Sequence, residues 1–189
     1  MSPTDELDQL ILTHYPYPLA INYKRLLDEP DMERKTRSAL HVFEFGLRAV
    51  ALQVISQYMQ HDINDIPDPA VNLLLSTRID KATLGVWREL LFTTLNAYDK
   101  HRDRLACPEL ADLCWERDTG SKRQGVQGSF VRLIEIRNRL AHRLPPQTEE
   151  EWRSLYGKVS VDLRTVLDLF SFLQNYDLVL CRQGPSGRE

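Results

Sequence analysis

The chain has 189 residues, of which 42% are hydrophobic and 27% are charged, a composition that fits one globular domain. The formal net charge of −3 gives no global attraction to nucleic acid, so contact with a polyanion requires a local basic patch. Three cysteines without a Cys-x-x-Cys pair argue against a disulfide framework, and the absence of a signal sequence or long apolar run predicts a cytoplasmic protein without a membrane span.

Apolar residues recur at helical spacing through most of the chain. Helices are predicted over residues 5–13, 19–27, 32–60, 84–104, 108–117 and 130–143, with a brief apolar run at 71–75. Asp31 is placed to cap the long helix 32–60. Thr148 and Glu151 form the pattern of a capping box, which opens a last helix whose apolar residues extend to Leu173.

These elements predict an all-α fold, a helical bundle framed by two long central helices, 32–60 and 84–104. Residues 1–182 are expected to form one domain. Residues 183–189 have the composition of a flexible tail or linker. The segment 118–129 contains three glycines and shows no apolar periodicity, so we expect a mobile loop there.

A charge interrupts the apolar face of the helix predicted over 130–143. At about 100° per residue, Arg137 lies near the middle of a face formed by Phe130, Leu133, Ile134, Leu140, Ala141 and Leu144. A guanidinium is costly to bury unless it is paired, so Arg137 needs a carboxylate partner, a subunit interface or an anionic ligand. Glu44, between two phenylalanines, is a candidate for that partner or for a polar residue at the edge of a cleft.

Asn138 and His142 lie on the flank of the same face. They are four residues apart, so their side chains stack, whereas Arg137 points roughly 140° away from His142 on an ideal helix. Arg137 and His142 converge if the helix loosens before Pro145 or if two copies pack across a two-fold axis. We therefore expect a homodimer with this helix at or beside the interface.

The run Arg137-Asn138-Arg139-Leu140-Ala141-His142, in a late helix of an all-helical domain, resembles the motif of the HEPN ribonuclease family. The resemblance implies a homodimer that cleaves RNA without a metal ion or other cofactor, leaving a 2′,3′-cyclic phosphate. In this interpretation Arg137 stabilises the phosphorane, His142 transfers protons and Asn138 orients the imidazole ring. The residue types suit the reaction, because histidine has an ordinary pKa of about 6.5 and arginine binds phosphate oxygens with two donors.

Basic residues outnumber acidic ones around this motif. Candidate RNA-binding residues are Lys122, Arg123, Arg132, Arg139 and Arg143. The alternative interpretation of each is a solvated side chain that forms ion pairs with a neighbouring helix. The motif itself has a similar alternative, a paired core arginine and a surface histidine.

Three functions follow from these patterns. The first is a HEPN-type endoribonuclease in toxin-like, antiviral or stress-related RNA cleavage, which an antitoxin or a downstream domain could restrain. The second is a catalytically inactive HEPN-like dimerisation or regulatory module at the N-terminus of a larger protein, which the linker-like tail from Gln183 favours. The third is a helical scaffold without a ligand.

The remaining histidines and cysteines do not predict a metal site. The histidines lack the spacing of metal ligands: His14, His41, His61 and His101. Cys107 and Cys114 are expected to be thiols that face the core.

Overall fold

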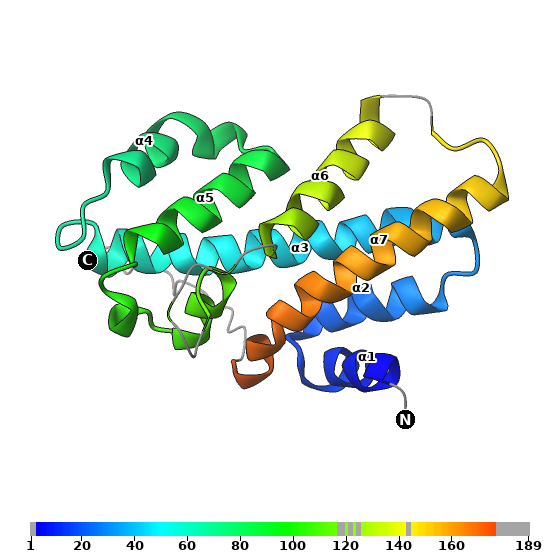
Figure 1. Cartoon of the computed structure of the whole chain (residues 1–189), viewed down its shortest axis with the longest axis horizontal. Coiled ribbons are helices and arrows are strands. Elements are labelled where there is room, and N and C mark those ends of the chain that lie inside the picture. Colours follow the sequence, from blue (N-terminus) through cyan, green and yellow to red (C-terminus); the bar gives the residue numbers. More distant parts are fainter. Residues whose placement is uncertain (1–2, 117–119, 121–122, 124–125, 143–144, 177–189) are drawn as a thin grey trace, which may run out of the picture.

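A computed structural model describes residues 3–116, 120, 123, 126–142 and 145–176. Within these residues the chain is helical and contains no β-strand (Figure 1), which confirms the predicted all-α bundle. The α-helices are α1 (Pro3–His14), α2 (Tyr17–Asp28), α3 (Met32–Gln57), α4 (Pro69–Arg78), α5 (Leu84–Ala97), α6 (Val126–His142) and α7 (Glu149–Leu169). Short turns of π or 3₁₀ helix are η1 (Tyr58–Asp62), η2 (Ile79–Lys81), η3 (Arg102–Arg104), η4 (Pro108–Leu113) and η5 (Ser171–Asn175).

Helix α3 is the axis of the bundle and runs across the whole molecule in Figure 1. It packs against α2, α5 and α7. The carboxylate of Asp31 accepts the Arg34 backbone N–H at 2.8 Å, so the predicted cap begins this helix. By length and composition alone, Met32–Gln60 is also apolar enough to cross a membrane; in this fold it is the helix around which the core is built.

The buried side chains form one hydrophobic cluster to which each of α1–α7 contributes. At its centre the ring of Phe130 meets those of Phe43, Phe92 and Phe170 edge to face, with centroids 5.3 to 6.1 Å apart. Gly46 lets the Phe170 ring lie against α3, because a Cβ at position 46 would come within 3.2 Å of that ring. The core therefore depends on close packing between α3, α6 and the end of α7.

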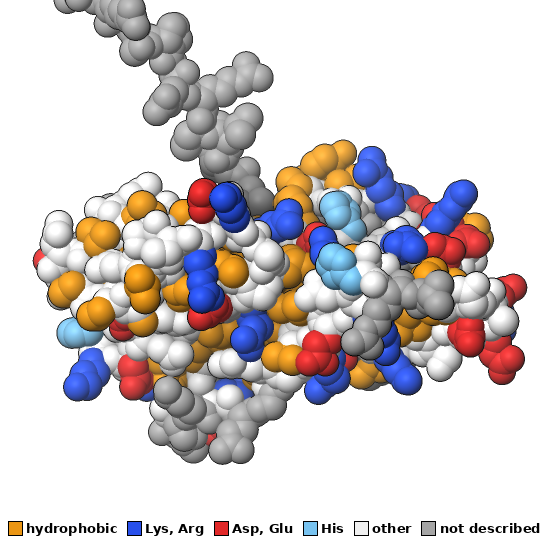
Figure 2. Space-filling view, turned by 90° about the horizontal axis from the view of Figure 1, so that it is seen from above, with side chains coloured by type: hydrophobic (Ala, Val, Ile, Leu, Met, Phe, Trp, Pro, Cys, Tyr) orange, Lys and Arg blue, Asp and Glu red, His pale blue; other side chains and the backbone are white. Residues whose placement is uncertain are grey.

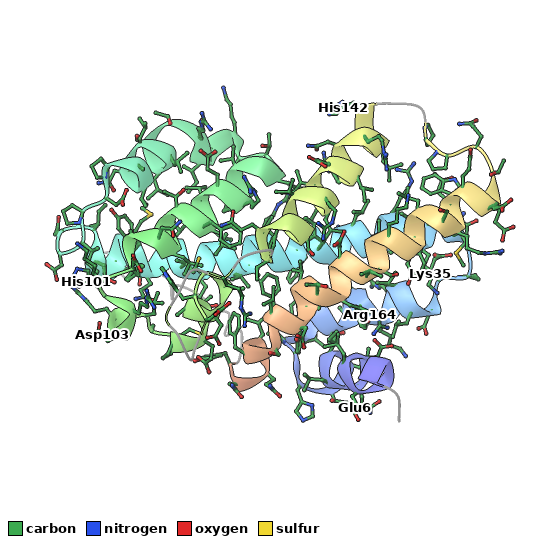
Figure 3. All side chains as sticks on the ribbon, in the orientation of Figure 1. Glu6, Lys35, His101, Asp103, His142 and Arg164 are labelled. Atoms are coloured by element: carbon green, nitrogen blue, oxygen red, sulfur yellow. The ribbon has the colours of Figure 1, made fainter. Side chains whose placement is uncertain are left out.

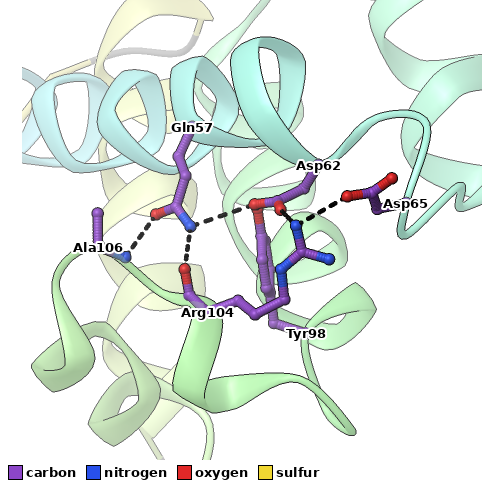
Figure 4. A network of polar contacts seen from close by, with 6 residues as sticks. All are labelled: Gln57, Asp62, Asp65, Tyr98, Arg104 and Ala106. Atoms are coloured by element: carbon purple, nitrogen blue, oxygen red, sulfur yellow. Dashed lines mark hydrogen bonds and ion pairs between the residues drawn. The ribbon is translucent and has the colours of Figure 1, made fainter.

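Helix α5 ends at Ala97, which makes the predicted end at 104 wrong. The chain turns at Tyr98, whose hydroxyl donates a hydrogen bond to the buried carboxylate of Asp62 at 2.6 Å. Burial is the main reason why the pKa of Tyr98 is raised, and the hydrogen bond to Asp62 raises it further. Arg104 pairs with Asp62 at 2.5 Å, and Gln57 bonds to the backbone carbonyl of Arg104 at 2.7 Å (Figure 4). These side-chain contacts fix the 98–106 segment beneath η1 in place of a longer helix.

The short helix predicted over 108–117 is present as the 3₁₀ helix η4, but it ends at Leu113. Cys107 and Cys114 are buried, as expected, and burial raises the pKa of the Cys107 thiol to about 11. Half of the predicted loop 118–129 lies outside the described residues, as does the whole tail 183–189. The predicted end of that loop is wrong, because α6 already begins at Val126.

The predicted capping box at the start of α7 is confirmed. Thr148 Oγ1 accepts the backbone N–H of Glu151 at 3.2 Å, and the Glu151 carboxylate accepts the backbone N–H groups of Gln147 and Thr148 at 2.7 and 3.1 Å. These backbone hydrogen bonds lower the pKa of Glu151, and the one from Gln147 contributes most. The box thereby fixes the point at which the chain re-enters the bundle after α6.

Candidate functional site

Helix α6 has two halves with different surroundings. Its buried residues all lie in the first half: Val126, Ser129, Phe130, Leu133 and Ile134. From Glu135 to His142 no residue of the helix is buried. Figures 1 and 3 show the second half rising away from α3, with His142 at its end. The Arg137–His142 motif therefore occupies the uncovered half of α6, defined here as residues 135–142.

The first half is held by a polar network with α7. Asp162, whose side chain is only 9% exposed, accepts hydrogen bonds from Ser129 Oγ at 2.9 Å and from Arg132 Nε and Nη2 at 2.6 to 3.1 Å. The hydrogen bond to Asp162 also raises the pKa of Arg132. Arg132, predicted to bind RNA, thus has a structural partner.

Arg137 pairs with Glu44 of α3, with Nε and Oε1 2.8 Å apart. The sequence left three candidates for the partner of Arg137, and the structure gives the carboxylate within the same chain. Glu44 is 18% exposed at its side chain and also lies 3.7 Å from Arg48 Nη2. Arg137 remains 39% exposed, and no other described residue accepts a hydrogen bond from its two Nη groups.

Three grooves border the uncovered half of α6, and Arg137 and His142 lie in two of them. The α6–α7 groove has a volume of about 1020 Å³ and is lined chiefly by Asn138, Arg139, His142, Ser154, Gly157 and Lys158. The α3–α6 groove has a volume of about 300 Å³ and is lined by Arg37, Leu40, His41, Glu44, Arg137, Leu140 and Ala141. Arg137 and His142 thus face different grooves, as the helical geometry predicts, and one chain does not bring them together.

The α6–α7 groove presents a histidine among unpaired cations. Within the described part of the chain, the side chains of Arg139, His142 and Lys158 form no hydrogen bond or ion pair. Figure 2 shows histidine side chains among Lys and Arg side chains on the face seen from above. Two acidic residues also line this groove: Asp162, which is matched by Arg132, and Glu135, which leaves Arg139 and Lys158 as a small excess of positive charge. The groove therefore suits an anionic ligand.

Asn138 lines the same groove as His142, but among the described residues no hydrogen bond joins the two side chains. In this structure, therefore, Asn138 does not hold the imidazole ring. Its predicted orienting role remains a prediction about the complex with a ligand or a second copy.

The other predicted RNA-binding residues are placed differently. Arg139 lines the α6–α7 groove. The backbone N–H of Arg123 donates to the Cys114 carbonyl at 2.8 Å, beside the start of α6. At 1.5 Å per residue, α6 separates its two ends by about 24 Å, so the structure does not bring Arg123 to His142. Lys122 and Arg143 lie outside the described residues.

His41 is the residue that sequence reasoning missed. It was grouped with scattered histidines, yet it lies exposed in the same groove as Arg137. Its signal is a polar stripe along α3, because Arg37, His41, Glu44 and Arg48 follow one another at intervals of four, three and four residues.

The arrangement separates two kinds of chemistry on the two sides of one helix. A histidine capable of proton transfer faces a basic groove, and an arginine held by a carboxylate faces a smaller groove with a second histidine. Among the described residues, no group of three or more His, Cys, Asp or Glu side chains is placed to hold a metal ion.

No family model matches the chain, and no curated protein or solved structure shows significant similarity to it.

Proposed function

We propose that the protein is a metal-independent endoribonuclease of the HEPN type that acts as a homodimer in the cytoplasm. His142 is the general acid and base, Arg137 stabilises the phosphorane, and Asn138 orients the ring. The observation that carries the proposal is the position of the motif on the uncovered half of α6, where His142 faces a basic groove of about 1020 Å³. A groove of this size accommodates nucleotides of a single strand.

The dimer is required by the separation of Arg137 from His142. A second copy packed beside the uncovered half of α6 brings the arginine of one chain toward the histidine of the other. The apolar side chains of this half leave some surface for such packing, because Ile136 and Leu140 are only half-buried in the single chain and Ala141 is exposed. Burial of these residues at an interface also lowers the local dielectric constant around the motif, which strengthens its interaction with a charged phosphate.

The reaction needs only a proton-transfer group and a cation. The 2′-hydroxyl of RNA attacks the adjacent phosphorus, the bond from phosphorus to the 5′-oxygen breaks, and the products are a 2′,3′-cyclic phosphate and a 5′-hydroxyl. Histidine accepts the proton of the 2′-hydroxyl and returns a proton to the leaving 5′-oxygen. The Nη groups of Arg137 interact with the extra negative charge that develops on the phosphorane.

The Arg137–Glu44 pair favours the second candidate, a catalytically inactive dimerisation or regulatory module. An arginine already matched by a carboxylate in its own chain has a structural role without any RNA. The same groove surface then binds a partner, and His142 contributes no chemistry. The two candidates differ in what Arg137 does, so both are tested on the same variants.

The test is RNA cleavage in the presence of EDTA. We expect His142→Ala and Arg137→Ala each to lower the cleavage rate by about a hundredfold or more, and Asn138→Ala to lower it less. Arg137→Lys should rescue poorly, because an ammonium group lacks the planar two-donor geometry of guanidinium. The matched control is His14→Ala, which removes an exposed histidine from α1 and should leave cleavage unchanged.

A measurement of thermal stability separates the candidates, and a measurement of oligomeric state tests the dimer that they share. A structural Arg137 predicts that Arg137→Ala lowers the melting temperature by a few degrees without any effect on cleavage. Unchanged cleavage in both alanine variants contradicts the enzyme and leaves the binding module. A monomer by light scattering at roughly tens of micromolar contradicts the dimer on which both depend.

A further inference from the structure

The α3–α6 groove combines cationic side chains from two helices. On α3, Arg37 and His41 lie one turn apart, and on α6 Arg137 faces them. The volume of about 300 Å³ lies at the lower end of the range for ligand pockets. We infer that this groove is a phosphate-binding site, in which Arg37, His41 and Arg137 contact a phosphate group of an RNA strand.

Arg37 is held in place at the groove. Its Nε and Nη2 atoms each lie 2.9 Å from Glu33 Oε1, and its guanidinium lies 5.7 Å from the centroid of the Trp152 ring. Its side chain is nevertheless 49% exposed. An arginine oriented by a carboxylate and an aromatic ring loses little conformational freedom when a phosphate binds to its remaining donors.

Arg137 is oriented in a similar way. The contact with Glu44 uses Nε, so the Nη groups remain for a second acceptor. Glu44 would repel a phosphate if its charge were unmatched, but it lies between Arg137 and Arg48. The ion pairs at this groove thus join three guanidinium groups, those of Arg37, Arg48 and Arg137, to only two carboxylates, those of Glu33 and Glu44. The cluster therefore has an excess of one positive charge.

His41 supplies a further donor beside the two arginines that line the groove. Its side chain is exposed and forms no hydrogen bond with a described residue. An imidazole N–H donates to a phosphate oxygen in either protonation state. His41 is thus a phosphate ligand that requires no rearrangement of the fold.

This inference rests on the proposed function in one respect, because Arg137 belongs to both sites. A strand that crosses the uncovered half of α6 places one phosphate in the α3–α6 groove and others in the α6–α7 groove. The groove of His41 then holds the backbone of the strand, while His142 acts on the other side of α6. Binding and cleavage depend on different histidines.

The experiment measures binding of two probes by isothermal titration calorimetry. One probe is a short DNA oligonucleotide, which lacks the 2′-hydroxyl and is not cleaved, and the other is inorganic phosphate. We expect His41→Ala and Arg37→Ala each to weaken binding of the oligonucleotide by about five- to tenfold, as for the loss of one charge-assisted hydrogen bond. Matched controls are His14→Ala on α1 and Arg78→Ala on α4, which lie outside the groove and should change binding by less than about twofold.

The outcomes separate this inference from the proposed function. If inorganic phosphate competes with the oligonucleotide and His41→Ala weakens that competition, the groove binds the phosphate group itself. If His41→Ala weakens binding of the oligonucleotide alone, the groove recognises phosphate only within a strand. Unchanged binding of both probes in His41→Ala and Arg37→Ala overturns the inference, even if RNA is cleaved. Binding that depends on His41 in a protein that cleaves no RNA overturns the proposed function alone. Unchanged melting temperatures confirm that the variants fold.

Discussion

The two halves of α6 belong to one continuous helix with one apolar period, yet only the first half contains fully buried residues. Phe130 in the first half is completely buried, whereas Leu140, on the same predicted face, is half-buried and Ala141 is exposed. Helical periodicity predicts which residues share a face, but the neighbouring helices decide how far along that face burial extends. The motif residues Arg137 to His142 lie in the half of α6 where burial by the neighbouring helices is incomplete.

The covered half gives the uncovered half a fixed base. Phe130 anchors α6 in the aromatic centre of the core, and the network of Asp162 fixes its rotation relative to α7. Side chains on a helix with such an anchor are positioned more precisely than side chains on a loop. The comparison thus predicts large losses of stability in the first half and almost none at the exposed, unpaired side chains of the second half.

The largest effect is expected for Phe130→Ala. Removing this buried ring leaves a cavity among three other phenylalanines and should lower the free energy of unfolding by about 3–5 kcal/mol. Chemical denaturation measures the loss. Tyr17→Ala, at an aromatic side chain that is 75% exposed, is the control and should change stability little. A loss below about 1 kcal/mol for Phe130→Ala would mean that the base of α6 is not packed as described.

The next effect is expected for Asp162→Asn. The substitution keeps the size of the side chain but removes the charge that accepts hydrogen bonds from Ser129 and Arg132, and it should cost about 1–3 kcal/mol. A double-mutant cycle with Arg132→Ala tests whether the loss belongs to the pair. Asp168→Asn, at an exposed aspartate of the same helix, is the matched control. Additive losses would show that the two side chains do not act together.

A smaller effect is expected at the capping box of α7. Thr148→Ala removes one cap hydrogen bond and should cost about 1 kcal/mol. Because the pKa of Glu151 is lowered in the folded state, its contribution is present above the unfolded pKa and is lost as the pH falls through the folded pKa. Glu151→Gln should therefore be less stable than the native protein at pH 7 and equally stable near pH 2. An equal deficit at both pH values would contradict a contribution from the charge.

The helices and caps could be predicted because they depend on residues close in sequence. The end of α5 and the start of α6 could not, because they depend on distant contacts. Tyr98 bonds to Asp62, 36 residues away, and Ser129 bonds to Asp162, 33 residues away. Both are tertiary hydrogen bonds between residues far apart in the sequence. Local helix and loop propensities therefore do not predict them.

The same distinction between local and long-range contacts applies to the candidate site. The angle between Arg137 and His142 follows from the geometry of one helix, so their separation could be predicted. The choice of Glu44 as the partner of Arg137 required contact across 93 residues, although the sequence did offer it as a candidate. The spacing along α3 places His41 in the same stripe as Glu44, but its place beside Arg137 also depends on how α3 and α6 pack.

The smallest effect is expected in the uncovered half, and it gives the sharpest test of the comparison. His142→Ala and Arg139→Ala remove exposed side chains that bond to no described residue, so each should change the free energy of unfolding by less than about 0.5 kcal/mol. Denaturation of the isolated protein at low concentration measures this for the single chain. The same variants measured at high concentration report on a dimer, since removal of an interface residue lowers the concentration dependence of the melting temperature. A loss above about 1 kcal/mol at low concentration would show that residues 135–142 support the fold itself, and the division of α6 into an anchored half and a free half would be wrong.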